Sequence, residues 1–257
     1  MLNSTPTRAP VRIERGDGFA RITVDRPEAR NAISAAVMEG LEDALDVLEA
    51  DPPNVVSFRG GGDRAFVSGG DLKEFSSIRG LDAARSMATR VRRILDRVVG
   101  LSSITIAELN GAALGGGAEL AVACDIRVAA DDVRLAFSQS TLAITPAWGG
   151  TERLTELVGR SRALYLLTTG VALPAQQACE WGLIEEVVPR VDFERRVNQL
   201  VGEIASRASP VLRSIKGIVS TVHPGVHPES AHEATELFAQ AWVADAHWDA
   251  MNRARRE

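Results

Sequence analysis

The segment "NGAALGGGAELAVACD", residues 110–125, places one carboxylate, Glu119, in an apolar run that contains four glycines. This is a poor choice for stability, because a helical glycine costs roughly 1 kcal/mol relative to alanine and an unpaired buried carboxylate costs more. Glu119 follows Gly116 by three residues, so on a helix it returns to the side of the Gly116 amide. There it can act as a base beside a polarised carbonyl. Alternatively, the glycines allow close packing and Glu119 pairs with an arginine; this segment alone leaves both interpretations open.

A second glycine-rich turn, "AFVSGGDLKEF" at residues 65–75, follows a predicted strand that ends at Phe58. Each turn presents a backbone N–H that no side chain obstructs. The turn before Glu119 also leads into a helix N-terminus, where the amides point outward with partial positive charge. Two such amides that converge on one point would form an oxyanion hole, in which each donor contributes about 3–4 kcal/mol to a transition state.

The sequence argues against several other kinds of chemistry. All four histidines, His223, His227, His232 and His247, follow residue 222. Pro-Gly separates the first two, so they cannot share a helix face as a zinc pair would, and we expect solvated surface histidines and no metal site. The chain lacks G-x-S-x-G, G-x-x-x-x-G-K-[ST] and a well-placed G-x-G-x-x-G. Triad hydrolases, P-loop NTPases and dinucleotide enzymes are therefore disfavoured.

The composition limits the classes of protein to which this chain can belong. With 257 residues, 45% of them hydrophobic, the chain can form one large core or a core with a helical appendage. Its net charge of −5 disfavours a general binder of nucleic acid or anionic membranes. Cys124 and Cys179 are too few for a disulfide framework, which favours a reducing compartment. The first residues, "MLNSTPTRAP", lack an apolar signal region, and no run approaches about 18 apolar residues, so we expect a cytoplasmic location and no membrane partner.

Predicted strands, glycine loops and helices alternate along the first 190 residues, which favours an α/β arrangement with ligands bound at the loops. Ser34 is the predicted N-cap of the first helix. Apolar residues recur at helical spacing in two predicted helices: Met38, Leu41, Leu45 and Leu48, then Val91, Ile94, Leu95 and Val98. The sequence also predicts a hairpin over 11–27, a buried strand from residue 54 to Phe58 that runs into a glycine-rich loop, and buried strands over 103–109 and 125–130.

After about Val191 the pattern is helical only. We interpret this change as a change of layer within one structure. Residues 1–195 are predicted to form the α/β core that carries the site, and residues 196–257 a C-terminal helical oligomerisation region.

Five segments together resemble the enoyl-CoA hydratase/isomerase (crotonase) family: "RPEARNAIS", "AFVSGGDLKEF", "NGAALGGGAELAVACDIRVAA", "PAWGGTERL" and "ACEWGLIEEVV". They occur in the family's order. The resemblance implies a crotonase-like spiral of ββα turns, followed by helices that build a homotrimer, often paired into a hexamer. It also implies a coenzyme A thioester as the ligand, with no cofactor apart from the coenzyme A of the substrate.

The resemblance assigns roles to individual positions. The oxyanion-hole amides fall on Gly70 and Gly116, where they would bind the thioester oxygen as it becomes an enolate. Arg30 and Lys73 match positions where basic residues meet the CoA phosphates, although a surface role fits each nearly as well. Trp148 is a candidate wall of the acyl pocket or a core residue. The other residues predicted to line the CoA and acyl site are Ala32, Ser68, Asp71 and Leu72.

Glu119 matches the first of the two catalytic glutamates of the hydratases, and the second position holds Gln139. Hydration typically uses two carboxylates, and an amide does not exchange a proton at neutral pH. Gln139 can still hydrogen-bond a water or a substrate carboxylate, and its neutrality removes repulsion of an anionic acyl group. The segment "STLAITPAWGG" further resembles family members that decarboxylate methylmalonyl- or ethylmalonyl-CoA, which also lack the second glutamate.

We therefore predict a CoA-thioester lyase that works through a bound enolate with Glu119 as its acid/base. Decarboxylation of a short 2-carboxyacyl-CoA ranks slightly above hydration or dehydration of an enoyl-CoA, and double-bond isomerisation ranks third. The alternative outside this class is a non-catalytic CoA-binding homologue. It rests on Gln139 and on the short C-terminus: the resemblance implies a basic, aromatic tail segment that helps to cover the CoA adenine, whereas this sequence stops at "NRARRE".

Overall fold

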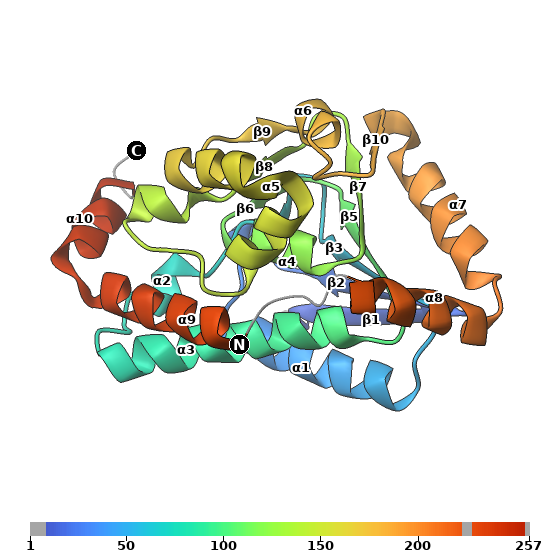
Figure 1. Ribbon diagram of the computed structural model, residues 1–257, viewed down its shortest axis with the longest axis horizontal. Helices are drawn as coiled ribbons and strands as arrows, with labels where there is room; N and C mark the ends of the chain where they lie inside the picture. The colour runs from blue at the N-terminus through green and yellow to red at the C-terminus, as the bar shows by residue number, and fades with distance from the viewer. Residues whose placement is uncertain (1–8, 223–227, 255–257) are drawn as a thin grey trace, which may run out of the picture.

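The computed structural model describes residues 9–222 and 228–254. Within these residues the chain forms two sheets flanked by helices (Figure 1). The larger sheet has the strand order β1-β2-β3-β5-β7-β10, with β1 and β2 antiparallel and the other neighbours parallel. Its strands are β1 Val11–Gly16, β2 Phe19–Val24, β3 Val55–Gly60, β5 Ile104–Leu109, β7 Ile126–Ala130 and β10 Glu186–Val188. The smaller sheet is β4 Ala65–Val67, β6 Ala112–Leu114, β8 Arg134–Ala136 and β9 Leu173–Pro174, in that order.

Each turn of the chain adds one strand to each sheet and then a helix. One turn is β3, β4 and α3 (Leu81–Gly100), the next is β5, β6 and α4 (Gly116–Ala123), and the third is β7, β8 and α5 (Gly150–Thr169). This ββα spiral confirms the α/β, crotonase-like fold that the sequence indicated. The sequence pattern missed the smaller sheet, because strands of two or three residues are too short to show an alternation of apolar and polar residues.

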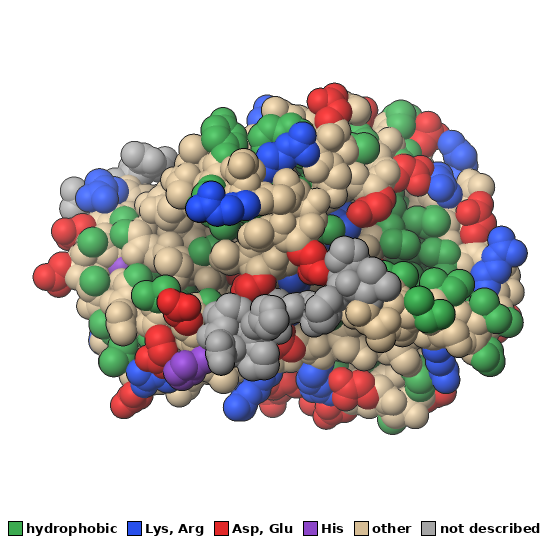
Figure 2. All heavy atoms as spheres, viewed as in Figure 1, with side chains coloured by type: hydrophobic (Ala, Val, Ile, Leu, Met, Phe, Trp, Pro, Cys, Tyr) green, Lys and Arg blue, Asp and Glu red, His purple; other side chains and the backbone are tan. Residues whose placement is uncertain are grey.

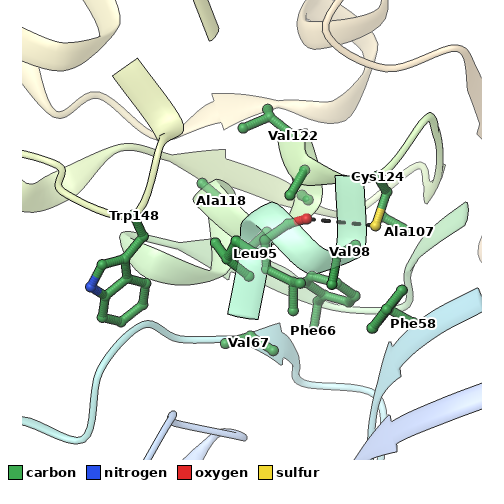
Figure 3. Close-up of a cluster of buried hydrophobic side chains, with 14 of the residues drawn as sticks. Phe58, Phe66, Val67, Leu95, Val98, Ala107, Ala118, Val122, Cys124 and Trp148 are labelled. Carbon is green, nitrogen blue, oxygen red and sulfur yellow. Dashed lines mark hydrogen bonds between the residues drawn. The ribbon is translucent and has the colours of Figure 1, made fainter. Parts of the chain in front are cut away.

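The first long helix, α1 (Ala35–Ala50), shows why the periodic segments were predictable. The Ser34 hydroxyl accepts a hydrogen bond from the Val37 N–H at 3.3 Å, which caps the helix as expected. The eight residues predicted at helical spacing in α1 and α3 are all buried in one core. Figure 3 shows part of this core, with Phe58 and Phe66 packed beneath α3 residues Leu95 and Val98.

The segment 110–125 contains a short strand before its helix. Residues 112–114 form β6, and α4 begins only at Gly116, after Gly115 turns the chain with φ of 53°. Every residue of α4 is buried. The turn at Gly115 therefore places the start of α4, and Glu119 one turn later, at the end of the smaller sheet.

The described elements after β10 are all helical: η3 Arg190–Asp192, α7 Phe193–Ala205, α8 Ser209–Val222, α9 Pro228–Val243 and α10 Asp245–Ala254. The remaining helices are η1 Pro27–Ala29, α2 Leu72–Phe75, η2 Ser138–Leu142 and α6 Ala175–Glu180. In Figure 1, α9 runs alongside α3, whereas α8 lies at the opposite end of the molecule. The oligomerisation role of residues 196–257 stays a prediction.

Helix α8 carries four apolar side chains that are more than half exposed: Val211, Ile215, Ile218 and Val219. Figure 2 shows hydrophobic side chains gathered on the side of the molecule where α7 and α8 lie. No helix among the described residues is both long and apolar enough to cross a membrane. Cys124 and Cys179 are both free thiols.

Candidate active site

The Glu119 carboxylate is buried, with 2% of the residue exposed, and accepts three hydrogen bonds. Its Oε2 accepts from the Trp148 N–H at 2.9 Å and the Gly150 N–H at 2.8 Å. Its Oε1 accepts from Nε2 of Gln139 at 2.8 Å. The arginine partner considered from the sequence is therefore not what satisfies this carboxylate: two backbone amides and a side-chain amide do so, which leaves its charge uncancelled.

Burial raises the pKa of Glu119 to about 7, because removal from water disfavours the charged form. The hydrogen bonds from Gly150, Trp148 and Gln139 act in the opposite direction, and the negative charge of nearby Glu152 adds a small increase. A carboxyl group whose pKa lies near neutrality can both take up and release a proton at physiological pH. This is the property that an acid/base catalyst needs.

The loop whose amides bind Glu119 is stabilised by Arg153 of α5. Arg153 is 8% exposed, and its Nη1 donates to the Trp148 carbonyl oxygen at 2.9 Å, while Nη2 pairs with Asp96 of α3. Gly149 has φ of 93°, a conformation that favours glycine and turns the amides on both sides of it toward Glu119. The segment "PAWGGTER" thus supplies both the amide donors and the arginine that fixes them.

The glycines before Glu119 allow the Trp148 indole to pack against the start of α4. A Cβ atom at Gly116 would overlap Cζ3 of Trp148, and one at Gly70 would lie 2.8 Å from Cε2 of Phe75 and 3.5 Å from Trp148. Figure 3 shows Trp148 at the edge of the core cluster, near Ala118 and Val67. The close-packing interpretation of these glycines is therefore correct, and it does not compete with a role for their amides.

The two glycine turns meet. A Cβ at Gly69 would lie 3.3 Å from the Gly116 nitrogen, and the turn at 69–71 is held beside Ile33 by hydrogen bonds of 2.8 Å at Gly69 O and Asp71 N. Gly116 is the first residue of α4, so its N–H has no acceptor within the helix. In the described part of the chain, neither the Gly70 nor the Gly116 N–H donates to a loop or side-chain acceptor. Both residues line one cavity with Glu119, as an oxyanion hole requires.

This cavity has a volume of about 80 Å³ and two kinds of lining. We call Gly70, Gly116, Glu119 and Gln139 its polar part, and Phe75, Met87, Leu142, Phe238 and Trp242 its apolar part. Ser68, Leu72 and Trp148, which the sequence analysis placed in the site, also line it.

Four other predicted site residues lie outside the cavity lining. Arg30 and Lys73 are exposed, and Ala32 is buried. Asp71 caps α2, since its Oδ1 accepts from the Glu74 N–H at 3.2 Å and its Oδ2 accepts from Arg26 at 3.0 Å. Ser68 N–H donates to the Arg30 carbonyl at 3.2 Å, so these residues flank one edge of the site. Their contact with CoA stays a prediction.

His247 corrects the expectation that the histidines are solvated. It is fully buried, and its Nδ1 lies 2.7 Å from the Leu142 carbonyl oxygen, a contact in which the ring N–H donates. His232 is exposed, as expected, and His223 and His227 lie outside the described residues. Among the described residues, no group of three or more His, Cys, Asp or Glu side chains is placed to hold a metal ion.

Sequence reasoning also missed Phe238 and Trp242, which lie about 120 residues after Glu119 in the chain. Their spacing of four residues indicates a buried helix face, but it does not show which part of the chain this face packs against. Arg153 and the Trp148 and Gly150 amides were within a recognised segment, yet only the folded loop shows that they contact Glu119.

The comparisons with known proteins agree with this geometry. The sequence pattern of the enoyl-CoA hydratase/isomerase family matches residues 14–248. Crotonyl-CoA hydratase from Syntrophomonas wolfei is 32% identical over 205 residues, which cover 79% of this chain and 78% of the relative. Short-chain-enoyl-CoA hydratase from Clostridium acetobutylicum is 29% identical over 241 residues, which cover 93% of this chain and 92% of the relative.

A solved structure is similar as well. The crystal structure of enoyl-CoA hydratase from Bacillus anthracis superimposes with a TM-score of 0.81 at 30% identity, over 96% of each chain. The chain therefore belongs to the enoyl-CoA hydratase/isomerase family, whose members act on CoA thioesters.

Proposed function

We propose that this protein is an enoyl-CoA hydratase in which Glu119 alone carries the proton. The observation that supports this most is the bonding of the carboxylate. A carboxylate offers about four lone-pair positions, and Trp148, Gly150 and Gln139 occupy three of them. The fourth belongs to Oε1, and it is available to one water molecule. The names of the relatives from S. wolfei and C. acetobutylicum also favour hydration.

The reaction proceeds in two proton transfers through one carboxylate. Glu119, ionised, takes a proton from the water while the water oxygen forms a bond to C3 of the enoyl group. The electron pair of the C2–C3 double bond moves onto the thioester, and the Gly70 and Gly116 amides stabilise the enolate oxygen. Glu119 then returns the proton to C2. One molecule of water is added, and the carboxylate ends in the state in which it began.

Gln139 has a positioning role in this scheme. Its Nε2 donates to Glu119, whereas its Oε1 is buried without a hydrogen-bond partner among the described residues. A buried amide oxygen without a partner is costly, so it favours a ligand that brings a donor. The second hydrogen of the attacking water is such a donor.

Decarboxylation of a 2-carboxyacyl-CoA is the second candidate, and the neutral side chain at Gln139 favours it. Loss of CO₂ leaves the same enolate, and Glu119 must then deliver a proton to C2. The two reactions need opposite starting states of one group: hydration needs the Glu119 carboxylate, and decarboxylation needs the carboxylic acid.

The test combines product masses with a pH profile. Crotonyl-CoA and methylmalonyl-CoA are incubated separately with the protein, and the products are followed by mass spectrometry. Hydration predicts the gain of one water on crotonyl-CoA, with kcat rising as pH increases through about 7, the pKa of Glu119. Loss of CO₂ from methylmalonyl-CoA, with kcat falling over the same pH interval, would show that the reaction is decarboxylation and would contradict hydration. CoA binding without any turnover would indicate the non-catalytic alternative.

We also propose a homotrimer or hexamer, as the family resemblance implies, and a cytoplasmic location. The exposed apolar side chains of α8 provide a surface for a second copy of the chain. The mass in solution, measured by light scattering, tests the assembly: a monomer would contradict it.

A further inference from the structure

The cavity is too small for a long acyl chain. Its volume of about 80 Å³ is roughly half that of a cavity of about 150 Å³ that holds one benzene ring. The cavity that holds the six carbons of benzene is about twice as large, so by proportion this cavity holds three or four carbons. The crotonyl carbons beyond the thioester carbonyl would fill it.

Helix α9 supplies one wall of the apolar part, and the side chains of this wall are closely packed. Phe238 and Trp242 are 4% and 2% exposed, and their rings pack with centroids 5.4 Å apart. The Trp242 Nε1–H donates to the Ile78 carbonyl oxygen at 2.9 Å, which fixes the orientation of the indole. In Figure 1, α9 lies along α3, and an ion pair between Arg85 and Glu236, 2.8 Å from Nη2 to Oε2, joins the two helices.

Helix α10 holds this wall from the other side. The His247 ring packs on Trp242 with centroids 4.5 Å apart, while its Nδ1–H binds the Leu142 carbonyl oxygen. Trp248 packs edge-on against both rings, and the Arg79 guanidinium lies 3.5 Å from the centre of the Trp248 ring. Trp242 is thus enclosed by groups that are themselves hydrogen-bonded or stacked. A longer acyl chain cannot displace it without breaking these contacts.

We infer that Phe238 and Trp242 are the specificity-determining residues that limit the acyl group to about four carbons. The inference rests on the proposed function only in taking an acyl-CoA as the ligand. It adds that the C-terminal helices of the same chain decide which acyl-CoA binds.

The experiment measures binding of saturated acyl-CoAs, which cannot be hydrated. Acetyl-, butyryl-, hexanoyl- and octanoyl-CoA are titrated calorimetrically into wild type, Phe238→Ala and Leu237→Ala. Leu237, the neighbouring residue on α9, is 49% exposed and serves as the matched control. We expect wild type to bind hexanoyl- and octanoyl-CoA at least 10-fold more weakly than butyryl-CoA. Phe238→Ala should improve the ratio of hexanoyl to butyryl affinity at least 10-fold, and Leu237→Ala should leave it within about 2-fold.

Equal affinity of wild type for butyryl- and octanoyl-CoA would overturn the inference, as would an unchanged ratio in Phe238→Ala. If Phe238→Ala does not fold, Phe238→Leu and Trp242→Phe remove fewer contacts and should shift the same ratio in the same direction. The proposed hydration is judged separately, from turnover of crotonyl-CoA. A protein that shows the length limit but no hydration would therefore refute the proposed function and leave this inference standing.

Discussion

The polar and apolar parts of the cavity are built in different ways. Three residues of the polar part, Gly116, Glu119 and Gln139, lie within 24 positions of one another in the sequence, on α4 and η2. The apolar part draws on α2, α3, η2 and α9, from Phe75 to Trp242. In the polar part, one helix turn aligns the Gly116 amide with the Glu119 carboxylate, and Gly70 joins them from the turn before α2. The size of the substrate depends on long-range packing between helices.

This difference predicts how variants should behave. Changes in the polar part should alter rate or pH dependence at constant substrate preference, whereas changes in the apolar part should alter preference. Three variants in and beside the polar part test the first half of this statement, a fourth variant in α7 serves as a stability control, and the acyl-CoA titration described above tests the second half.

Glu119→Gln should have the largest effect, because it removes the group that transfers the proton. General acid–base catalysis is worth about 10²- to 10⁴-fold, so kcat for crotonyl-CoA should fall by that order. Butyryl-CoA should bind nearly as before, since the amide keeps the shape of the carboxylate. Steady-state kinetics and calorimetry measure the two quantities, and unchanged turnover would show that Glu119 is not the acid/base.

Gly116→Ala should reduce both rate and stability. Its methyl group overlaps the Trp148 indole, which must move away from the oxyanion amides. Alanine keeps the backbone N–H of residue 116, but the clash displaces it, so kcat should fall by up to the about 10²- to 10³-fold that complete loss of an oxyanion donor costs. Overpacking costs about 1–3 kcal/mol in free energy of unfolding. Kinetics and denaturant unfolding check the two effects. A fully active, equally stable variant would contradict the packing of Trp148 on α4.

Arg153→Met should lower kcat by about 10-fold, since it loosens the loop whose amides bind Glu119. Weaker amide hydrogen bonds stabilise the carboxylate less, so the pKa of Glu119 should rise and the pH profile of kcat should move to higher pH. Arg162→Met is the control in the second half of α5, beyond the kink at Gly159, because Arg162 is exposed and lies over Trp181. A lower kcat with an unmoved pH profile would mean that Arg153 is only structural.

Gly202→Ala should have the smallest effect. It is the control for Gly116→Ala, because it makes the same change at a helical position without a steric clash. Gly202 lies in the interior of α7, and a Cβ there meets no atom within 4 Å. Replacing a helical glycine by alanine without a clash should raise the free energy of unfolding by about 0.5–1 kcal/mol and leave kcat unchanged. Thermal unfolding measures the gain, and a loss of stability would show that α7 packs more tightly than the structure describes.

Much of the site could be predicted because its signals are local. The glycines, Glu119 and Gln139 occur in segments whose order and spacing identify the family, and Ser34 and the periodic leucines define helices without knowledge of their partners. The smaller sheet could not be predicted, since its strands are too short to carry a pattern.

Gln139→Glu tests the assignment of the second catalytic position from the sequence. With two carboxylates in contact, one proton is shared and the pH profile of kcat should move to higher pH.

The sequence by itself determined the family and, through that resemblance, the ββα spiral, and it singled out Glu119 as the candidate acid/base, because each depends on residue types at fixed spacing along the chain. The tertiary structure alone decided what Glu119 binds and what limits the cavity. The Gly150 amide is 31 residues from Glu119, and His247 is 105 residues from the carbonyl it binds at Leu142. Such contacts form only when separate elements pack together, so no local pattern encodes them. That is why His247 looked like a surface histidine in the sequence and lies fully buried against Trp242, in the apolar part of the cavity lining.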